Sequence, residues 1–345
     1  MSTSTVRIGV VGCGAIARAF HLRILQNHRN VRLSAIADAD ESNLSRAKGI
    51  AEDAQQFSSA SALIESRLAD GVVVCLPPAL HVEVGVAALR AGCHVYMEKP
   101  IATSSVDAER LVNAWRDSGK VGMMGFNFRL NGQFIALRDR VRSAVVGKVI
   151  AVRTTFTIPT HELPAWKRQR TSGGGVLLDL ASHHADLVEF ILQEEVQSVF
   201  ATCRSFESEA DHAAIQLITE SGTAVQSLFS LGTADAHRIE VWGTRGMIEG
   251  DLRALRDVTF TPATFEGART RRVRRALAQF HPRHMLRHGG DEPSFSRALD
   301  TFIHAIRNGS SASEVTPDLH DGARSLRIVE AMERSIATGE PEIVA

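Results

Sequence analysis

The chain has 345 residues, which is more than one ordinary hydrophobic core requires and favours two domains. Hydrophobic residues make up 44% and charged residues 23% of it, a balance typical of a folded globular protein and not of a disordered one. Lys plus Arg and Asp plus Glu each number 39, so no overall charge would recruit nucleic acid or an acidic membrane surface.

The first third of the chain alternates short apolar runs with helical patterns. Strands are predicted at 6–11, 31–37, 71–76, 94–98 and 121–126. Helices are predicted at 15–27, 41–50, 80–91 and 104–118. Strands that are apolar along their whole length, with helices between them, indicate a parallel, doubly wound sheet covered on both faces. We predict that this α/β domain occupies residues 1–125.

The pattern changes after about residue 125. Further strands are predicted at 149–158, 196–206, 213–219, 223–231 and 238–243, several with two-residue alternation, which is typical of antiparallel pairing. Helices are predicted at 132–144, 177–192, 295–307 and 319–337. We therefore expect a second, α+β domain over residues 126–345 with an open, mostly antiparallel sheet. Its terminal helix is a candidate to pack back onto the first domain.

Cysteine spacing and the N-terminus indicate the compartment. The cysteines form no C-x-x-C pair, and their spacing matches neither a zinc site nor a disulfide framework. The first residues lack a basic segment, and glycines break the apolar run that follows, so a strand is predicted and not a signal peptide. No apolar run approaches the roughly 20 residues that span a bilayer. We expect a cytoplasmic protein with no membrane partner.

A glycine turn follows the first predicted strand and opens the first predicted helix. In Gly12-x-Gly14-x-x-Ala17, Gly12 permits the tight turn, Gly14 lets the backbone approach a pyrophosphate, and Ala17 keeps the helix close to the strand. The helix N-terminus offers N–H groups to the phosphates. This is the usual opening of a dinucleotide-binding Rossmann fold, and its predicted cofactor contacts are Gly12, Cys13, Gly14, Ala15 and Ile16.

Asp38 closes the second predicted strand, 21 residues after Ala17. A carboxylate there accepts hydrogen bonds from the adenosine ribose and repels a 2′-phosphate, which favours NAD over NADP. Alternatively, Asp38 caps the helix that begins near Asp40. Helix-end amides could lower the pKa of the Cys13 thiol, but we favour a small residue tolerated beneath the phosphates.

Two further strand ends carry candidate site residues. Leu76, Pro77 and His81 follow the strand at 71–76, where such folds line the cofactor crevice, although His81 is equally explained as a helix-start residue. The strand at 94–98 leads into Glu98-Lys99-Pro100. A lysine at the end of an apolar run, just before a proline, is well placed for proton transfer.

These motifs resemble the glucose-fructose oxidoreductase, inositol dehydrogenase and rhizopine catabolism (Gfo/Idh/MocA) family over nearly the whole chain. The resemblance rests on the glycine turn and on Glu98-Lys99-Pro100, Gly125-Phe126-Asn127 and Gly173-Gly174-Gly175-x-x-x-Asp179-x-x-x-His183. It implies an NAD(H)-dependent oxidoreductase that moves a hydride between nicotinamide and a secondary alcohol or ketone. The implied substrate is a sugar, a sugar derivative (possibly nucleotide-linked) or a cyclitol.

The resemblance also implies roles for individual residues. Lys99 lies beside the nicotinamide ribose and the reacting carbinol, and Asp179 and His183 face it from the second domain across the interdomain cleft. Asp179 then orients a substrate hydroxyl while His183 moves its proton; residues i and i+4 of a helix share one face, which fits. An ordinary surface pair is the alternative.

Other residues have implied supporting roles. Glu98 fixes the strand end and contacts the cofactor, and Asn127 contacts cofactor and substrate. Pro100 follows a cis peptide bond, as in many family members. Trp166 lies on a loop where it would stack on a sugar ring or simply anchor the chain. No further metal ligands accompany Asp179 and His183, so we expect no metal.

Two rival functions remain open on the same fold. One is a glycosidase in which tightly held NAD transiently oxidises a sugar; the other is a regulator that binds NAD without chemistry, which the presence of Lys99, Asp179 and His183 argues against. The arginine-rich stretch 267–290, which carries no acidic residue, suggests either a lid over an anionic substrate or a solvated or subunit-contact segment. Family members commonly associate through the second domain's sheet, so a homodimer or homotetramer is expected.

Overall fold

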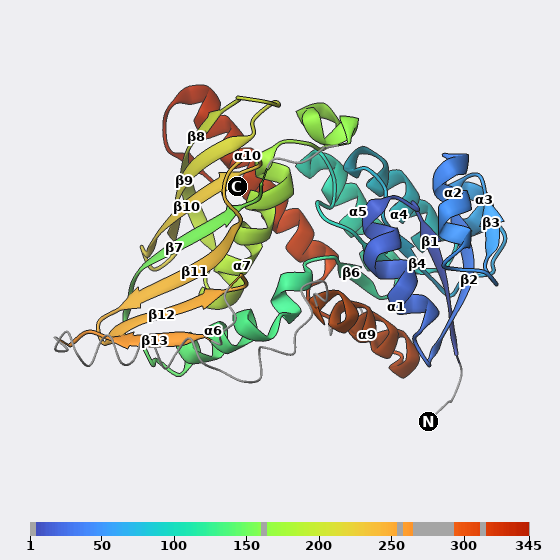
Figure 1. Cartoon of the computed structure of the whole chain (residues 1–345), viewed down its shortest axis with the longest axis horizontal. Coiled ribbons are helices and arrows are strands. Elements are labelled where there is room, and N and C mark those ends of the chain that lie inside the picture. The colour runs from blue at the N-terminus through green and yellow to red at the C-terminus, as the bar shows by residue number, and fades with distance from the viewer. Residues whose placement is uncertain (1–4, 160–163, 254–257, 265–292, 311–314, 345) are drawn as a thin grey trace. The chain divides into compact units, whose positions relative to one another are not determined.

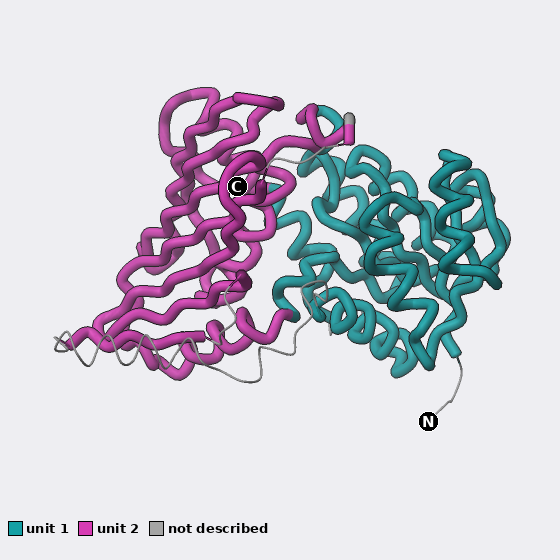
Figure 2. The backbone as a smooth tube through the Cα atoms, viewed as in Figure 1, with its two compact units in different colours: residues 1–130, 171–173, 293–326 teal, residues 131–170, 174–292, 327–345 magenta. Residues whose placement is uncertain are grey.

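The structure is a computed structural model that describes residues 5–159, 164–253, 258–264, 293–310 and 315–344 (Figure 1). The chain forms two compact units, coloured separately in Figure 2. Unit 1 comprises residues 1–130, 171–173 and 293–326, and unit 2 comprises residues 131–170, 174–292 and 327–345. The arginine-rich stretch 267–290 lies outside the described residues.

Unit 1 is built on a six-stranded, wholly parallel sheet in the order β3-β2-β1-β4-β5-β6. This confirms the predicted doubly wound sheet. Its strands are β1 Val6–Val11, β2 Val31–Ala37, β3 Gln55–Phe57, β4 Gly71–Val74, β5 His94–Met97 and β6 Gly122–Met124. The strand order reverses between β1 and β4, and ligands of such sheets bind beyond the carboxyl ends of the strands at that point.

Some helices of unit 1 begin at a capping side chain. Asp40 accepts the N–H groups of Ser42 and Asn43, and Ser104 accepts that of Asp107, which satisfies N–H groups that lack partners within the helix. The helices are η1 Ala17–His21 (a π-helical turn), α1 Leu22–Gln26, α2 Glu41–Lys48, α3 Ala60–Glu65, η2 Pro78–Leu80, α4 His81–Arg90, α5 Ser105–Ser118, η3 Asn127–Leu130 and α9 Pro293–Asn308.

The sheet of unit 1 is buried from both sides. On one face, α9 inserts Leu299, Phe302 and Ile303 into the cluster that holds Ile8 and Val10 of β1. On the other face, α4 lies against α5 and β5: a Cβ at Gly85 would lie 2.8 Å from side-chain atoms of both Leu111 and Met97. Burial on two faces explains why β4 is apolar along its length.

Unit 2 contains a mixed, mostly antiparallel sheet of eight strands in the order β13-β12-β11-β7-β10-β9-β8-β14 (Figure 1). This confirms the predicted class, although β7 and β10 pair in parallel. The short strands β12 to β14 were not predicted. The strands are β7 Val149–Thr157, β8 Val196–Arg204, β9 His212–Thr219, β10 Ala224–Ser230, β11 Ala236–Gly243, β12 Gly246–Asp251, β13 Thr259–Pro262 and β14 Glu342–Ile343.

Helices cover one face of this sheet. Contacts join α6 to β12, η6 to β7 and β10, and α6 to α7. The opposite face exposes the large apolar side chains Phe200, Leu228, Trp242 and Ile343, of which Trp242 is 45% exposed. The remaining helices are α6 Gly132–Arg142, η4 Ala165–Arg168, η5 Arg170–Ser172, η6 Leu177–Ala181 (also π-helical), α7 Ser182–Leu192 and α10 Leu319–Thr338.

Candidate active site

The glycine turn has one crowded and one open position. Gly12 has a φ of +88°, and a Cβ there would lie 2.4 Å from the carbonyl oxygen of Cys75, so only glycine fits. A Cβ at Gly14 would meet no atom within 4 Å. The exposed Ala15 and Ile16 follow. The turn therefore presents open backbone at the start of a helix, which is the arrangement that binds pyrophosphate.

Asp38, at the end of β2, is hydrogen-bonded to the turn. Its Oδ2 accepts the Cys13 N–H at 2.7 Å, and its Oδ1 accepts the N–H of Asp40 at 2.8 Å. Asp40, and not Asp38, caps α2. Arg18 also braces this region, because its Nη1 donates to the Cys13 carbonyl and to Asn43 Oδ1.

Cys13 is buried beneath the turn. Burial raises the pKa of its thiol to about 12, and the nearby Asp38 charge adds to the effect. The thiol therefore stays neutral, so lowering of its pKa by helix-end amides does not occur. This environment suits a small residue and not a nucleophile.

Glu98, Lys99 and Pro100 form a tight turn directly after β5, and the Lys99–Pro100 bond is cis. Glu98 is 8% exposed; its Oε1 lies 2.7 Å from Nε2 of the fully buried His21, and its Oε2 accepts the Lys99 N–H at 3.3 Å. His21 belongs to the helical segment that the glycine turn opens. The two motifs are thus joined by one buried pair.

His81 holds the other side of this turn. Its Nδ1 lies 2.8 Å from the Pro100 carbonyl oxygen and its Nε2 lies 2.7 Å from that of Leu76. Burial lowers the pKa of His81, so the neutral ring donates to one carbonyl at a time. Since both ring nitrogens face protein carbonyls, the structure gives His81 a supporting position. Pro77 lies between, at the start of η2.

Asn127 is also engaged by the protein. It is 2% exposed, and its amide nitrogen donates to Oγ of Ser294 at 2.7 Å. Ser294 belongs to α9, about 170 residues further along the chain. The bond holds the first turn of α9 against η3, beyond the end of β6.

Asp179 and His183 lie on the buried helical segment that follows the triple glycine, in unit 2. Gly173 and Gly175 have φ values of +94° and +87°, and a Cβ at Gly174 would lie 2.3 Å from the Lys167 carbonyl oxygen. Asp179 and His183 are 9% and 6% exposed. The helix begins with a π turn at 177–181, so the geometry from Asp179 to His183 is not that of a regular α-helix.

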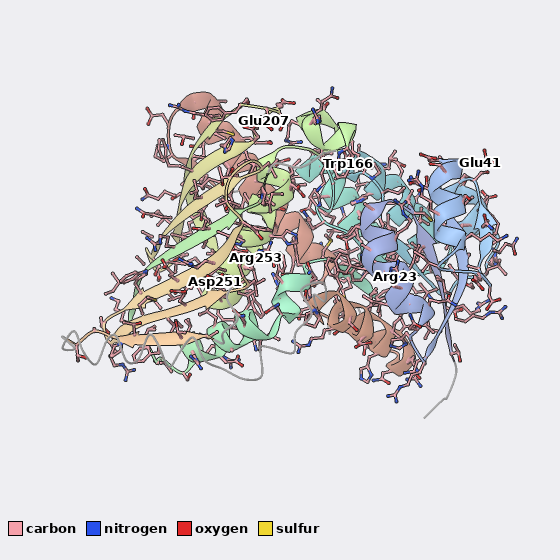
Figure 3. The ribbon with its side chains drawn as sticks, viewed as in Figure 1. Arg23, Glu41, Trp166, Glu207, Asp251 and Arg253 are labelled. Carbon is pink, nitrogen blue, oxygen red and sulfur yellow. The ribbon has the colours of Figure 1, made fainter. Side chains whose placement is uncertain are left out.

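A cation that the sequence did not single out accompanies Asp179. Lys167 Nζ lies 2.8 Å from Asp179 Oδ2 and 5.5 Å from the ring centroid of Trp166. Trp166 comes from η4 and is labelled in Figure 3.

Within the described ranges, no group of three or more His, Cys, Asp or Glu side chains could hold a metal ion. No described helix combines the length and apolar character needed to cross a membrane.

Comparison with known proteins finds two family matches. Residues 6–126 match the Gfo/Idh/MocA oxidoreductase family with its NAD-binding Rossmann fold. Residues 134–249 match the Gfo/Idh/MocA C-terminal domain. An inositol 2-dehydrogenase of Rhizobium meliloti is 27% identical over 96% of this chain and 97% of its own length. A 1,5-anhydro-D-fructose reductase of Ensifer adhaerens is 30% identical over 71% of this chain and 75% of its own length.

The fold also matches solved structures. The WlbA dehydrogenase of Bordetella pertussis, crystallised with NADH and UDP-GlcNAcA, superposes with a TM-score of 0.85. The alignment covers 100% of this chain and 99% of that protein, at 22% identity. At this identity the likeness shows the fold alone.

The buried His184 predicts acid sensitivity. It stacks on Phe156 and lies 5.1 Å from His237 (ring centroids), and neither of its ring nitrogens has a hydrogen-bond partner in the described part of the chain. Burial lowers its pKa from 6.5 to about 3. His184 is therefore protonated below about pH 6.5 in the unfolded chain but only below about pH 3 in the folded chain. The free energy of unfolding therefore falls as the pH drops below 6.5.

We expect His184→Leu to reduce this acid sensitivity. From pH 7.5 to pH 5, wild type should lose about 2 kcal/mol more unfolding free energy than the variant. Urea unfolding at both pH values measures the difference. The exposed His304→Leu should behave like wild type. Equal pH dependence in wild type and His184→Leu would contradict the prediction.

Proposed function

This chain belongs to the Gfo/Idh/MocA family of NAD-binding oxidoreductases, and we propose that it is an NAD(H)-dependent dehydrogenase or ketoreductase. Its proposed substrates are secondary alcohols or ketones of sugars, sugar derivatives or cyclitols. The observation that carries the proposal lies within unit 1. The open glycine turn and the lysine turn after β5 are joined there through the His21–Glu98 pair.

NAD is the proposed cofactor, in preference to NADP. The glycine turn, with open space at Gly14, would hold the pyrophosphate, and Ile16, 37% exposed, would cover it. The Asp38 carboxylate is fixed at the end of β2, where it would accept a ribose hydroxyl and repel a 2′-phosphate. Leu76, Pro77 and Asn127 complete the proposed cofactor contacts at the neighbouring strand ends.

Lys99, Asp179 and His183 are the proposed catalytic residues. The bound nicotinamide supplies the hydride acceptor in oxidation and the donor in reduction. During oxidation the hydride leaves the carbinol carbon while the hydroxyl proton passes to Lys99 or to a relay with His183, and reduction reverses both transfers. Asp179 orients a substrate hydroxyl, and Trp166 offers a flat apolar face to a sugar ring.

The relatives' names define the substrates to test. Inositol and anhydrofructose are both polyhydroxylated rings, so myo-inositol with NAD and 1,5-anhydro-D-fructose with NADH are the first compounds to assay. Methyl α-D-glucoside extends the panel to glycosides. Net NADH formation from an intact polyol supports the dehydrogenase. Release of methanol from the glucoside without net NADH would support an NAD-dependent glycosidase instead.

A homodimer or homotetramer is proposed through the exposed face of the unit 2 sheet. Leu228 of β10 and Trp242 of β11 are 51% and 45% exposed on that face, on the two strands that flank β7, with Phe200 and Ile343 on further strands. Apolar patches of this kind on soluble proteins commonly mark protein interfaces. A second copy of the chain would cover them by presenting the same face.

Gly14→Ala should weaken cofactor binding without unfolding the protein. A methyl group at this position meets no protein atom but occupies the space proposed for the pyrophosphate. We expect the Kd for NADH, measured by fluorescence titration, to rise at least tenfold at an unchanged Tm. Gly12→Ala is the contrasting variant: its Cβ strikes the Cys75 carbonyl, so it should lose about 2–4 kcal/mol of unfolding free energy. Tight NADH binding by Gly14→Ala would contradict the proposed site.

Lys99→Met should lower turnover strongly while leaving cofactor binding intact. Loss of a positioned proton-transfer group lowers kcat by about 10²–10⁴-fold. We expect that loss on the best substrate of the panel, with the Kd for NADH within threefold of wild type. Lys148→Met, at an exposed lysine of unit 2, is the matched control and should retain full activity. Wild-type turnover by Lys99→Met would refute the assignment.

Charges placed on the exposed sheet face should dissociate the oligomer. We expect the double variant Leu228→Glu and Trp242→Glu to sediment as a monomer, because each substitution would bury an unpaired carboxylate in the interface. Sedimentation velocity compares it with wild type at equal concentration. A monomeric wild-type protein, or a double variant that keeps its oligomeric state, would contradict the proposed interface.

A further inference from the structure

Lys167 and Asp179 form an ion pair whose two side chains are not equally buried. The ammonium nitrogen lies 2.8 Å from Asp179 Oδ2, and the two side chains are 27% and 11% exposed. Both residues belong to unit 2. The pair therefore combines a nearly buried carboxylate with a lysine that still reaches solvent.

The loop between the two residues fixes Lys167 through its backbone. The Lys167 carbonyl accepts the N–H of Gly175 at 3.1 Å, and the N–H of Gly174 donates to the Gln169 carbonyl at 2.9 Å. A side chain at Gly174 would strike the Lys167 carbonyl. The triple glycine therefore lets the backbone at Lys167 approach the start of the helical segment that carries Asp179.

The far end of the loop is fixed as well. The Arg170 guanidinium pairs with Glu333 of α10, and its backbone N–H donates to Glu209 Oε2 at 2.9 Å. Lys167 is thus held at its main chain from both sides. Its ammonium group is held by the ion pair with Asp179.

The pair offers one donor and one acceptor side by side. An ammonium has three N–H donors, and Asp179 is the one hydrogen-bond acceptor for Lys167 Nζ among the described residues. A carboxylate oxygen accepts several hydrogen bonds. Adjacent hydroxyls of a polyol lie about one hydrogen-bond length apart, and each can both donate and accept. The pair matches such a diol in spacing and in hydrogen-bond direction.

We propose that Lys167 and Asp179 together bind two adjacent hydroxyls of the substrate. Lys167 donates to the oxygen of one hydroxyl, and Asp179 accepts the hydrogen of the other. This inference rests on the proposed function and adds Lys167 to its substrate contacts, at the hydroxyl next to the reacting carbinol.

The test is a double-mutant cycle between enzyme and substrate. The Lys167 side chain is changed in the enzyme, one hydroxyl is omitted from the substrate, and kcat/KM is compared for all four combinations. Wild type and Lys167→Met are assayed on myo-inositol and methyl α-D-glucoside. Each compound is compared with analogues that lack one hydroxyl next to the reacting carbon. Lys148→Met is the matched control, and Lys167→Gln, which keeps a donor without the charge, is the second variant in case Lys167→Met does not fold. The Kd for NADH is measured in parallel.

We expect wild type to prefer the full diol to one deoxy analogue by at least tenfold in kcat/KM. In Lys167→Met the ratio of kcat/KM for the diol to kcat/KM for the deoxy analogue should fall to within threefold of 1. The variant has no donor for that hydroxyl, so it gains nothing from the hydroxyl's presence. The Kd for NADH should stay unchanged. Lys167→Gln should fall between the two, and Lys148→Met should match wild type.

The outcomes separate the inference from the function on which it rests. A Lys167 variant that loses activity by the same factor on diol and deoxy compounds would show a structural role and overturn the inference alone. A wild-type enzyme that oxidises deoxy analogues as well as diols would also overturn it. A wild-type protein that turns over no compound of the panel would overturn the proposed function and this inference with it.

Discussion

The buried hydrogen bond between His21 and Glu98 is the constraint around which unit 1 is organised. It joins the helical segment opened by the glycine turn to the residue before Lys99, and His81 fixes the carbonyl of the residue after it. Removing one partner of a buried hydrogen bond costs about 1–3 kcal/mol, and more when the group left behind is charged. Lys99 therefore lies on a turn that is held on both sides by buried imidazoles.

The sequence predicted most of unit 1 because its strands are buried on both faces and therefore read as apolar runs. Val6–Val11 and Val31–Ala37 match the prediction at both ends. Gln55–Phe57 was missed because three residues are too few to show a period, and the same holds for the two-residue strand β14. The placement of α9 in unit 1 had no local signal, since it depends on packing partners far away in the sequence.

In the candidate site too, local motifs were predicted from the sequence and contacts between distant residues were not. The glycine turn, Lys99 and the Asp179–His183 spacing are local motifs, so they were visible in the sequence. The partners that hold them were not: His21 lies 77 residues from Glu98, and Lys167 lies 12 residues before Asp179 across an irregular loop. The π turns at 17–21 and 177–181 also have no simple sequence signal, and both fall where a motif enters a helix.

The position of α9 has a consequence for how this protein is made. Leu299, Phe302 and Ile303 complete the apolar layer over β1, yet they leave the ribosome long after the last strand of that sheet. Until then Ile8, Val10 and their neighbours lack a cover on one side, and exposed apolar surface of this kind favours aggregation of a nascent chain. The parallel sheet of unit 1 therefore completes its core only after α9 has been made, and a fragment that stops after β6 would lack part of that core.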